Sequence, residues 1–524
     1  MKRRIAILSI LILTATLTAC GLFPTFTVPT TNVTTASTSP LSTSAPTTGI
    51  SSSATTAATT TTEGTLSTLP TTTQTTSAPT TTVMTTTTQT TTQTTTTQTT
   101  TTQTTTTTQT GAQPFVPTGY SLLQDELDYV GIPATGNVKL LVFVIDFTDA
   151  RLASSGVTLA DVDKAFNGAS ADTAWESLAS FYAKSSYGQL SLDADIFSYH
   201  ASETVAYYEE DWLDYYTESD LIYEMMTYYD GQIDYSDYDA NADGYLDGVY
   251  VLYTAPVSYK SGSDLWWAYQ DYYYYVGEDY FDGVTPNYFC WSGTDFLLEA
   301  GSAGVDAHTL IHETGHMLGL DDYYDYDDSD AYNAGGVGGA DMMDYAVGDH
   351  SAISKILLGW ITPLVVTSSM TVDIAPFVAA GETILVIDEW RGTIFDEYLL
   401  ISYYTPTGLN AYDNYYLFTI PGVLIHHVDA RIGQGYIEDS AYWTIFNYNN
   451  SDTAHKFLKI IEADENDRIP YDAWCEDGDL FQAGDVFRQT IEPVYRWYQT
   501  SRTMNFTVAI VSVGDTAVLT FTFN

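Results

Sequence analysis

Leu310 to Asp322 reads L-I-H-E-T-G-H-M-L-G-L-D-D, and this stretch carries the strongest signal for fold and chemistry in the chain. His312 and His316 are four residues apart, so on a helix their imidazoles share one face and can bind a single metal ion. Glu313 projects about 100° further round the helix, where its carboxylate can take a proton from an attacking water. This combination predicts a Zn²⁺ site with its catalytic base beside it.

The same stretch is expected to be a helix from about Gly304 to Gly319. Apolar residues recur along one side at helical spacing, and a glycine commonly ends a helix. The alternative is a purely structural helix with a chance motif. That alternative is improbable because the chain has only 8 His in 524 residues.

A zinc site needs a third ligand, and the turn after the helix offers one. Asp322 lies ten residues after His312, where the long metzincin motif H-E-x-x-H-x-x-G-x-x-H carries its third His. A carboxylate oxygen is an acceptable zinc ligand. The alternative is that Asp321, Asp322 and Asp325 form an acidic loop that is solvated or holds calcium.

A glycine-rich run from Gly335 to Gly339 leads into Ala340-Asp341-Met342-Met343-Asp344-Tyr345. This pattern is similar to a Met-turn, with the Met343 thioether beneath the zinc. Tyr345 follows two residues later, where some metzincins carry a tyrosine that can move onto the metal or an oxyanion. The alternatives are an ordinary core methionine and a packing tyrosine, in a chain that has 42 tyrosines.

Several separate segments together resemble the M6 family of bacterial metallopeptidases, the immune inhibitor A group. The segments are Leu140 to Phe147, Phe181-Tyr182, Ser186 to Leu190, Asp239 to Asp247, His312 to Asp322 and Asp341 to Trp360. The resemblance implies that His312, His316 and Asp322 bind zinc and that Glu313 is the general base. The chain departs from the family at Ala340, where an aromatic residue is usual, and this bears on substrate subsites more than on the metal.

The first residues are typical of an exported lipoprotein. Lys2 to Arg4 precede an apolar run from Ile5 to Leu13, as in a secretory signal. Leu17-Thr18-Ala19-Cys20 looks like a bacterial lipobox, in which residues 1 to 19 are removed and Cys20 carries the lipid. The alternative is a signal peptide cut elsewhere. We expect the chain to be anchored at the extracellular face of the bacterial cell membrane through Cys20 only.

Residues 20 to 113 form a segment of Thr, Ser, Pro, Gln, Ala and Gly with too few apolar residues to bury a core. This composition predicts a disordered linker or surface stalk. The whole chain has 17 basic and 66 acidic residues, a formal net charge of −49. Nucleic acid and anionic lipid are therefore poor partners, whereas cationic substrates and divalent cations are compatible with the charge.

Part of the acidic charge is organised as a potential calcium loop. Residues 239 to 247 read D-A-N-A-D-G-Y-L-D, with alternate oxygen ligands and Gly244 at the sixth position, as in an EF-hand loop. The expected ligands are the side chains of Asp239, Asn241, Asp243 and Asp247 and the backbone carbonyl of Tyr245. Tyr250 replaces the usual Glu at position twelve, and Gly248 to Ala255 alternates like a strand. The alternative is an acidic surface turn.

The order of the segments predicts two folded domains. Residues 114 to 362 are expected to form a mixed α/β, metzincin-like peptidase domain. Its expected strands are Val138 to Phe147, Gln189 to Phe197 and Gly248 to Ala255, and its expected helices are Ala174 to Lys184 and Leu221 to Tyr229. Seven short alternating segments follow in residues 363 to 524 and predict a β-sandwich. They are Met370 to Ile374, Thr383 to Ile387, Tyr398 to Tyr403, Val423 to Val428, Phe457 to Ile461, Met504 to Val511 and Ala517 to Phe523.

The remaining histidines and cysteines are expected to be structural. His426 and His427 have no spaced partner for a second metal site, and His308 and His350 are interpreted in the same way. Cys290 and Cys475 could form one disulfide or be two isolated buried thiols.

These features together predict a zinc metalloendopeptidase that acts as a monomer on extracellular proteins or peptides, with Zn²⁺ and also Ca²⁺ as cofactors. One alternative is an inactive surface adhesin or binding module with the same fold, against which the intact Glu313 argues. Another is a glycoprotein-directed peptidase whose C-terminal sandwich binds carbohydrate.

Overall fold

The computed structural model describes residues 112–114, 131–211, 216–257, 264–326, 336–411, 417–433, 436–437, 442–443, 445–451, 455–469, 474–488 and 495–524. The predicted signal peptide, Cys20, Gly335 and the linker up to Gly111 lie outside these residues. All described residues belong to one compact unit. None of the helices in this part of the chain combines the length and apolar composition of a membrane span.

A five-stranded sheet forms the first half, in the order β3-β2-β4-β6-β5. Its strands are β2 (Gly136–Asp146), β3 (Leu190–His200), β4 (Val249–Tyr253), β5 (Tyr269–Tyr272) and β6 (Tyr288–Gly293). The first four in this order pair in parallel, and β5 is an antiparallel edge strand. Strand β2 reads as a nearly continuous apolar run because both of its faces are buried, as is usual in parallel sheets.

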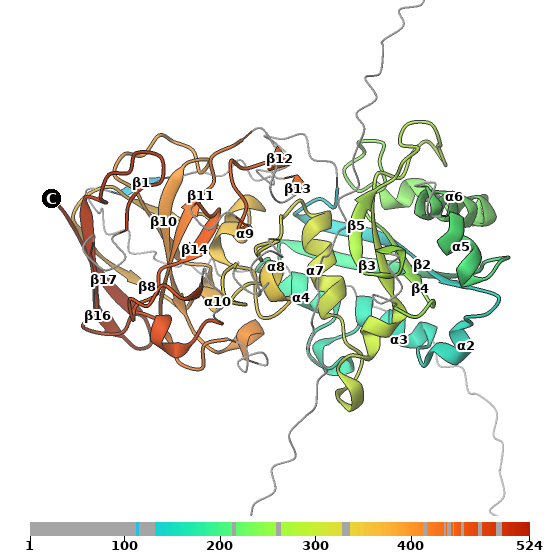
Figure 1. The fold of residues 1–524 in the computed structure, drawn as a ribbon, viewed down its shortest axis with the longest axis horizontal. Helices are drawn as coiled ribbons and strands as arrows, with labels where there is room; N and C mark the ends of the chain where they lie inside the picture. The colour runs from blue at the N-terminus through green and yellow to red at the C-terminus, as the bar shows by residue number, and fades with distance from the viewer. Residues whose placement is uncertain are drawn as a thin grey trace, which may run out of the picture. The chain divides into compact units, whose positions relative to one another are not determined.

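Helices cover both faces of this sheet (Figure 1). One face carries α3 (Leu159–Asn167), α4 (Leu178–Ser185) and α7 (His308–Met317), and the other carries α5 (Val205–Asp211) and α6 (Thr217–Tyr229). The short helix α2 (Leu152–Ser155) follows β2.

The helix predicted from Ala174 begins later, at Leu178. Ser177 caps it, because the Ser177 hydroxyl accepts from the Ser180 N–H at 3.0 Å and the Ser180 hydroxyl accepts from the Ser177 N–H at 2.9 Å. This reciprocal pair fixes the first turn. The predicted strands agree with the observed ones to within a few residues.

The second half contains two antiparallel-rich sheets that share one apolar core, in the arrangement of a sandwich. The six-stranded sheet has β1 (Ala112–Pro114), β7 (Leu364–Val366), β9 (Thr383–Val386), β10 (Glu397–Tyr404), β11 (Gly422–Asp429) and β14 (Leu458–Ile460). The four-stranded sheet has β15 (Val486–Phe487), β16 (Phe506–Val513), β17 (Ala517–Phe523) and β8 (Met370–Ile374).

Shorter elements connect these parts. They are the pair β12 (Tyr436–Ile437) and β13 (Tyr442–Trp443), the helices α8 (Met342–Tyr345), α9 (Ala352–Leu357) and α10 (Phe377–Ala380), and the 3-10 turns η1 (Ser170–Asp172), η3 (Tyr235–Tyr238), η4 (Asp264–Trp266), η5 (Thr294–Leu298), η6 (Gly301–Ala303), η7 (Gly408–Asn410) and η9 (Asp477–Asp479).

The six-stranded sheet is buried on both faces. One face packs in the core of the sandwich, and the other packs in a core that also contains residues of the first half. Leu399 and Ile401 of β10 belong to the core of the sandwich. Leu400, between them, belongs to the core that also contains Ile353 and Ile356 of α9. The predicted boundary at residue 362 therefore falls within packed structure and not in a loose linker.

Strand β1 pairs antiparallel with β7, so Ala112 faces Val366 in the second half of the chain. The predicted linker, which extends to Gln113, thus overlaps the start of an ordered strand. Cys290 and Cys475 are both buried, and no disulfide joins them. Of the two alternatives for these cysteines, the structure has two separate thiols.

Candidate metal centre

Helix α7 is shorter than predicted at its start and ends at the expected glycine. The Asp306 carboxylate accepts a hydrogen bond from the His308 N–H at 3.0 Å, so the helix begins at His308 and not at Gly304. At the other end Gly319 has φ of +94°, a left-handed conformation that favours glycine. The Leu320 N–H then donates to Gly315 O at 3.0 Å.

The Gly319 N–H also donates, to His316 O at 2.8 Å. These two bonds form a Schellman motif, which satisfies the last helix carbonyls and reverses the chain direction. The reversal returns residues 320 to 322 to the face of α7 that carries the two imidazoles. One glycine therefore ends the helix and positions the third predicted ligand.

The three predicted zinc ligands come together at this point. Asp322 Oδ1 lies 3.0 Å from His312 Nε2 and 3.1 Å from His316 Nε2. Ligand atoms at 2.0–2.2 Å from a tetrahedral ion are separated by about 3.3 Å, so these separations are close to those of a zinc site. The donor set of two imidazoles and a carboxylate also fits zinc, with the fourth position left for water or substrate.

Each ligand is oriented by a partner on its other side. His312 Nδ1 lies 2.8 Å from Met342 O, and His316 Nδ1 lies 2.8 Å from Leu320 O. A carbonyl can only accept, so both Nδ1 atoms carry a proton, and a metal ion at the centre would meet the Nε2 atom of each imidazole. The Tyr326 hydroxyl donates to Asp322 Oδ2, which leaves Oδ1 to face the imidazoles.

The charges of the centre are strongly coupled. Burial disfavours the charged form of Asp322, yet the neighbouring imidazoles of His316 and His312 hold the pKa of its carboxyl well below its usual range. Burial also disfavours protonation of His316, but the Asp322 carboxylate raises the pKa of this imidazole to about 10. The Asp322 carboxylate therefore attracts positive charge to this point, which is the charge that a bound cation would supply.

Glu313 is buried beside these ligands on α7, with 5% of its surface exposed. Burial raises the pKa of its carboxyl. The rival interpretation, in which Asp321, Asp322 and Asp325 form one acidic loop, is less consistent with the geometry. Asp325 faces Lys456 at 4.0 Å, whereas Asp322 faces the two imidazoles.

Met343 packs directly against helix α7. A Cβ on Gly315 would collide with Met343 Sδ and lie 2.9 Å from its Cε. A larger residue at position 315 would therefore force the Met343 thioether to move. The segment is held by Asp341, whose Oδ1 accepts from the Met343 N–H and whose Oδ2 accepts from the Ser351 N–H, each at 2.7 Å.

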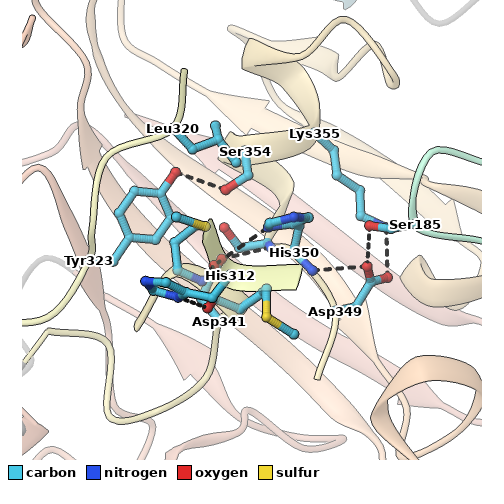
Figure 2. A network of polar contacts seen from close by, with 12 residues as sticks. Ser185, His312, Leu320, Tyr323, Asp341, Asp349, His350, Ser354 and Lys355 are labelled. Atoms are coloured by element: carbon cyan, nitrogen blue, oxygen red, sulfur yellow. Dashed lines mark hydrogen bonds and ion pairs between the residues drawn. The ribbon is translucent and has the colours of Figure 1, made fainter. Parts of the chain in front are cut away.

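A buried polar network lies behind this segment, and Figure 2 shows its side chains. Lys355 is fully buried, with Nζ 2.6 Å from Asp349 Oδ2. Asp349 Oδ1 accepts from the Ser185 hydroxyl at 2.6 Å and from the His350 N–H at 2.9 Å. The network joins α4, α9 and the segment after α8, because its members come from all three.

Tyr345 is half-buried and packs against Trp474, with ring centroids 4.4 Å apart and nearly perpendicular planes. The Trp474 ring also covers Gly339, where a Cβ would lie 2.6 Å from Cζ3. These contacts describe a packing role for Tyr345. Its movement onto a metal or an oxyanion stays a prediction.

The predicted calcium loop is closed by its own hydrogen bonds. Asp239 accepts from the N–H groups of Asp243 and Gly244, each at 3.0 Å. Asp243 Oδ1 accepts from the Tyr245 N–H at 2.9 Å, and buried Asp247 accepts from the Ala240 N–H at 2.7 Å.

Asn241 takes part in the same loop, because its Oδ1 accepts from the Asp243 N–H at 3.2 Å. Burial, reinforced by the charges of Asp239 and Asp243, raises the pKa of the Asp247 carboxyl to about 7. The loop then feeds strand β4, as expected from its alternation. Calcium binding by the loop stays a prediction.

The other histidines have structural surroundings. His426 and His427 are consecutive in β11 and so face opposite sides of the sheet. His427 Nε2 lies 2.9 Å from Glu397 Oε1, whereas burial lowers the pKa of His426 to about 4. His350 lines the same cavity as His426.

His308 stacks on Trp175, with ring centroids 4.5 Å apart. His350 Nδ1 lies 4.0 Å from Asp341 Oδ1, which is too long for a hydrogen bond. Burial holds the pKa of His350 well below its usual range, so this imidazole is neutral.

No known protein family matches the chain, and no curated protein sequence matches it either. The resemblance to M6 peptidases therefore rests on the sequence motifs alone. Sequence reasoning did not identify the groups that orient the ligands, namely Leu320 O, Met342 O and the Tyr326 hydroxyl. Carbonyls carry no sequence signal, and only the position of Tyr326, four residues after Asp322, could have drawn attention to it.

Proposed function

We propose that the chain is a zinc-dependent metalloendopeptidase that resembles the M6 type and cleaves proteins or peptides outside the cell. The approach of Asp322 Oδ1 to His312 Nε2 at 3.0 Å and to His316 Nε2 at 3.1 Å carries this proposal. Three residues selected by spacing alone converge on one point, with their outer atoms held by separate partners. The five-stranded sheet with its antiparallel edge strand and the Met343 contact support a metzincin-like fold.

In the proposed reaction His312, His316 and Asp322 hold zinc, which when bound activates water and polarises the scissile carbonyl. Glu313 takes the proton of the attacking water and later delivers it to the leaving amine. Its burial excludes bulk water, so the carboxylate interacts mainly with the substrate and the attacking water. The hydrogen bonds to Met342 O and Leu320 O keep both imidazoles in the required tautomer and orientation.

The sequence supports a location at the extracellular face of the bacterial cell membrane, anchored through Cys20. The Asp239 to Asp247 loop is proposed as a structural calcium site. The net charge of −49 favours cationic substrates over nucleic acid. The proposed active form is a monomer.

The glycoprotein-directed alternative makes a prediction about the surface of the C-terminal sandwich. Carbohydrate binding by the C-terminal sandwich would require exposed aromatic side chains on it. In the described residues the strongly exposed tyrosines all lie in the first half of the chain, and Trp474 is the exposed aromatic residue of the second. This distribution does not favour the glycoprotein-directed alternative.

The decisive comparison uses the purified full chain and Glu313→Ala, with zinc per chain and cleavage of denatured casein measured on both. We expect both proteins to bind one zinc and only the unaltered chain to cleave casein. Loss of the base should lower the rate by about 10²–10⁴-fold. A zinc-loaded but equally inert unaltered chain would favour the adhesin or binding-module alternative, and a chain without zinc would refute the proposal.

A further inference from the structure

A second group of acidic side chains lies just beyond strand β14 in the second half of the chain. Glu462, Asp464 and Asp479 place one carboxylate oxygen each within 4.8 Å of the others. Glu462 and Asp479 are fully buried, and Asp464 is exposed. Asp479 is the last residue of η9, so the group joins two segments that are distant in sequence.

One cation faces this group, and it does not balance the charge. The Arg468 guanidinium lies 3.8 Å from Glu462 Oε2, 3.4 Å from Asp479 Oδ1 and 3.9 Å from Asp464 Oδ2. The same guanidinium makes its close ion pair with Glu476 instead. Within the described part of the chain, four carboxylates therefore face one guanidinium, an excess of three negative charges when all four are ionised.

One carboxylate oxygen of buried Glu462 has no hydrogen-bond partner among the described residues. Its Oε1 accepts a hydrogen bond from the Ile469 N–H at 2.8 Å, but its Oε2 accepts none. Burial of an ionised carboxylate is unfavourable when one of its oxygens has lost hydration without gaining a hydrogen bond. Burial accordingly raises the pKa of Glu462 and raises that of Asp479 to about 6. Among the described residues, the Arg468 guanidinium is the positive charge that faces these three carboxylates, and it comes no closer than 3.4 Å to any of them.

The donor set identifies the class of ligand. All three groups offer carboxylate oxygen, which is preferred by hard cations and disfavours zinc and copper relative to nitrogen or sulfur donors. Calcium accepts irregular sets of carboxylates and carbonyls from flexible loops, whereas magnesium requires a nearly ideal octahedron. We propose that Glu462, Asp464 and Asp479 form a calcium site, which is separate from the Asp239 to Asp247 loop and from the zinc centre.

This site would order a segment that packs on the glycine-rich turn before Met343 and on Tyr345. Cys475 lies four residues before Asp479, and its N–H donates to Gly338 O at 2.9 Å. Trp474 covers Gly339 and packs against Tyr345. Calcium at Asp479 therefore fixes η9 and, through residues 474 and 475, the glycine-rich turn that precedes the Met343 segment.

The test counts calcium ions bound per chain in equilibrium dialysis against Ca²⁺ with Mg²⁺ in excess. The full chain is compared with Asp479→Asn and with Asp243→Asn as a matched change in the other acidic loop. We expect Asp479→Asn to bind one calcium fewer than the unaltered chain. The double variant should bind one fewer than Asp243→Asn, whether or not the Asp239 to Asp247 loop binds calcium.

A second variant separates loss of the site from loss of the fold. Glu462→Gln keeps an acceptor for the Ile469 N–H, so it should remain folded in EDTA and still lose one calcium. Arg468→Gln removes the competing cation and should bind calcium more tightly than the unaltered chain. Equal calcium counts for the unaltered chain, Asp479→Asn and Glu462→Gln would overturn the proposal and leave Arg468 as the counter-ion.

Discussion

The candidate zinc centre and the Asp239 to Asp247 loop are both metal sites predicted from spacing, but the structure builds them differently. In the zinc centre, groups outside the ligand set hold the ligands. Leu320 O and Met342 O fix the imidazoles, and Tyr326 fixes the carboxylate. In the acidic loop, the carboxylates of Asp239 and Asp243 accept hydrogen bonds from the N–H groups of the loop itself.

The difference concerns preorganisation. Ligands that are held from outside keep their free atoms directed to one point, so metal binding requires little rearrangement. In the acidic loop the carboxylates are held by N–H groups of the loop itself, so their positions shift with the loop, and a less rigid site binds calcium more weakly for the same number of charges. We expect the zinc affinity of the candidate centre to depend on each of its ligands. We expect the stability of the acidic loop to depend on bound calcium.

The largest effect is expected at the third zinc ligand. Asp322→Ala should weaken zinc binding by at least about 100-fold, because even the loss of a supporting partner costs 10–100-fold. Asp321→Ala is the matched control, since Asp321 is the adjacent carboxylate. Competition for zinc against a chelator of known affinity gives the comparison. Equal losses in both variants would restore the interpretation of an acidic loop.

The acidic loop should respond to calcium instead of zinc. At a calcium concentration about 100 times the dissociation constant, binding to the folded state contributes about 2.7 kcal/mol of stability. Asp243→Asn should lose this calcium-dependent part and retain its zinc content. Urea unfolding with and without calcium measures it, and an undiminished calcium effect in the variant would exclude Asp243 as a ligand.

A smaller effect should follow from loss of an external support. Tyr326→Phe removes the hydroxyl that donates to Asp322 Oδ2 and keeps the aromatic ring. Zinc affinity should fall by about 10-fold, at the lower end of the range for such partners. The same chelator competition serves here. An unchanged affinity would show that Asp322 needs no support and would weaken the contrast between the two regions.

The smallest effects are expected from alanine substitutions at two glycines with matched backbone conformations. Gly319 and Gly244 have φ of +94° and +90°, so alanine should cost about 1 kcal/mol of stability at either position. Gly319→Ala should also lower zinc affinity, because that turn positions Leu320 O and Asp322. Gly244→Ala should leave zinc affinity unchanged. Equal zinc affinities in the two variants would contradict the role of the turn.

Local patterns in the sequence predicted most of the elements and the members of the centre. Helix α7, its terminal glycine and the convergence of His312, His316 and Asp322 follow from spacing within thirteen residues. Helix α7 begins at His308, later than the predicted Gly304. The Asp306 carboxylate accepts the His308 N–H at this point, although the apolar pattern extends further towards the N-terminus. The Ser177 cap of α4 has the same effect and could have been recognised from Ser177 and Ser180.

Features that depend on distant contacts could not be predicted. The close contact at Gly315 comes from Met343, which approaches the helix from another segment. Burial of both faces of β10 joins the two predicted domains, but its nearly continuous apolar run does not indicate which elements cover each face. The pairing of β1 with β7 joins residues more than 250 positions apart, as in Ala112 with Val366. Each of these depends on tertiary packing and leaves no local periodicity.

The most direct test of the account is a crystal structure of the zinc-loaded chain with anomalous data collected at the zinc edge. The account predicts one strong anomalous peak bonded to His312 Nε2, His316 Nε2 and an Asp322 oxygen, each at about 2.0–2.2 Å. A peak coordinated by Asp321 or Asp325 in place of Asp322, or no zinc peak at α7, would contradict it.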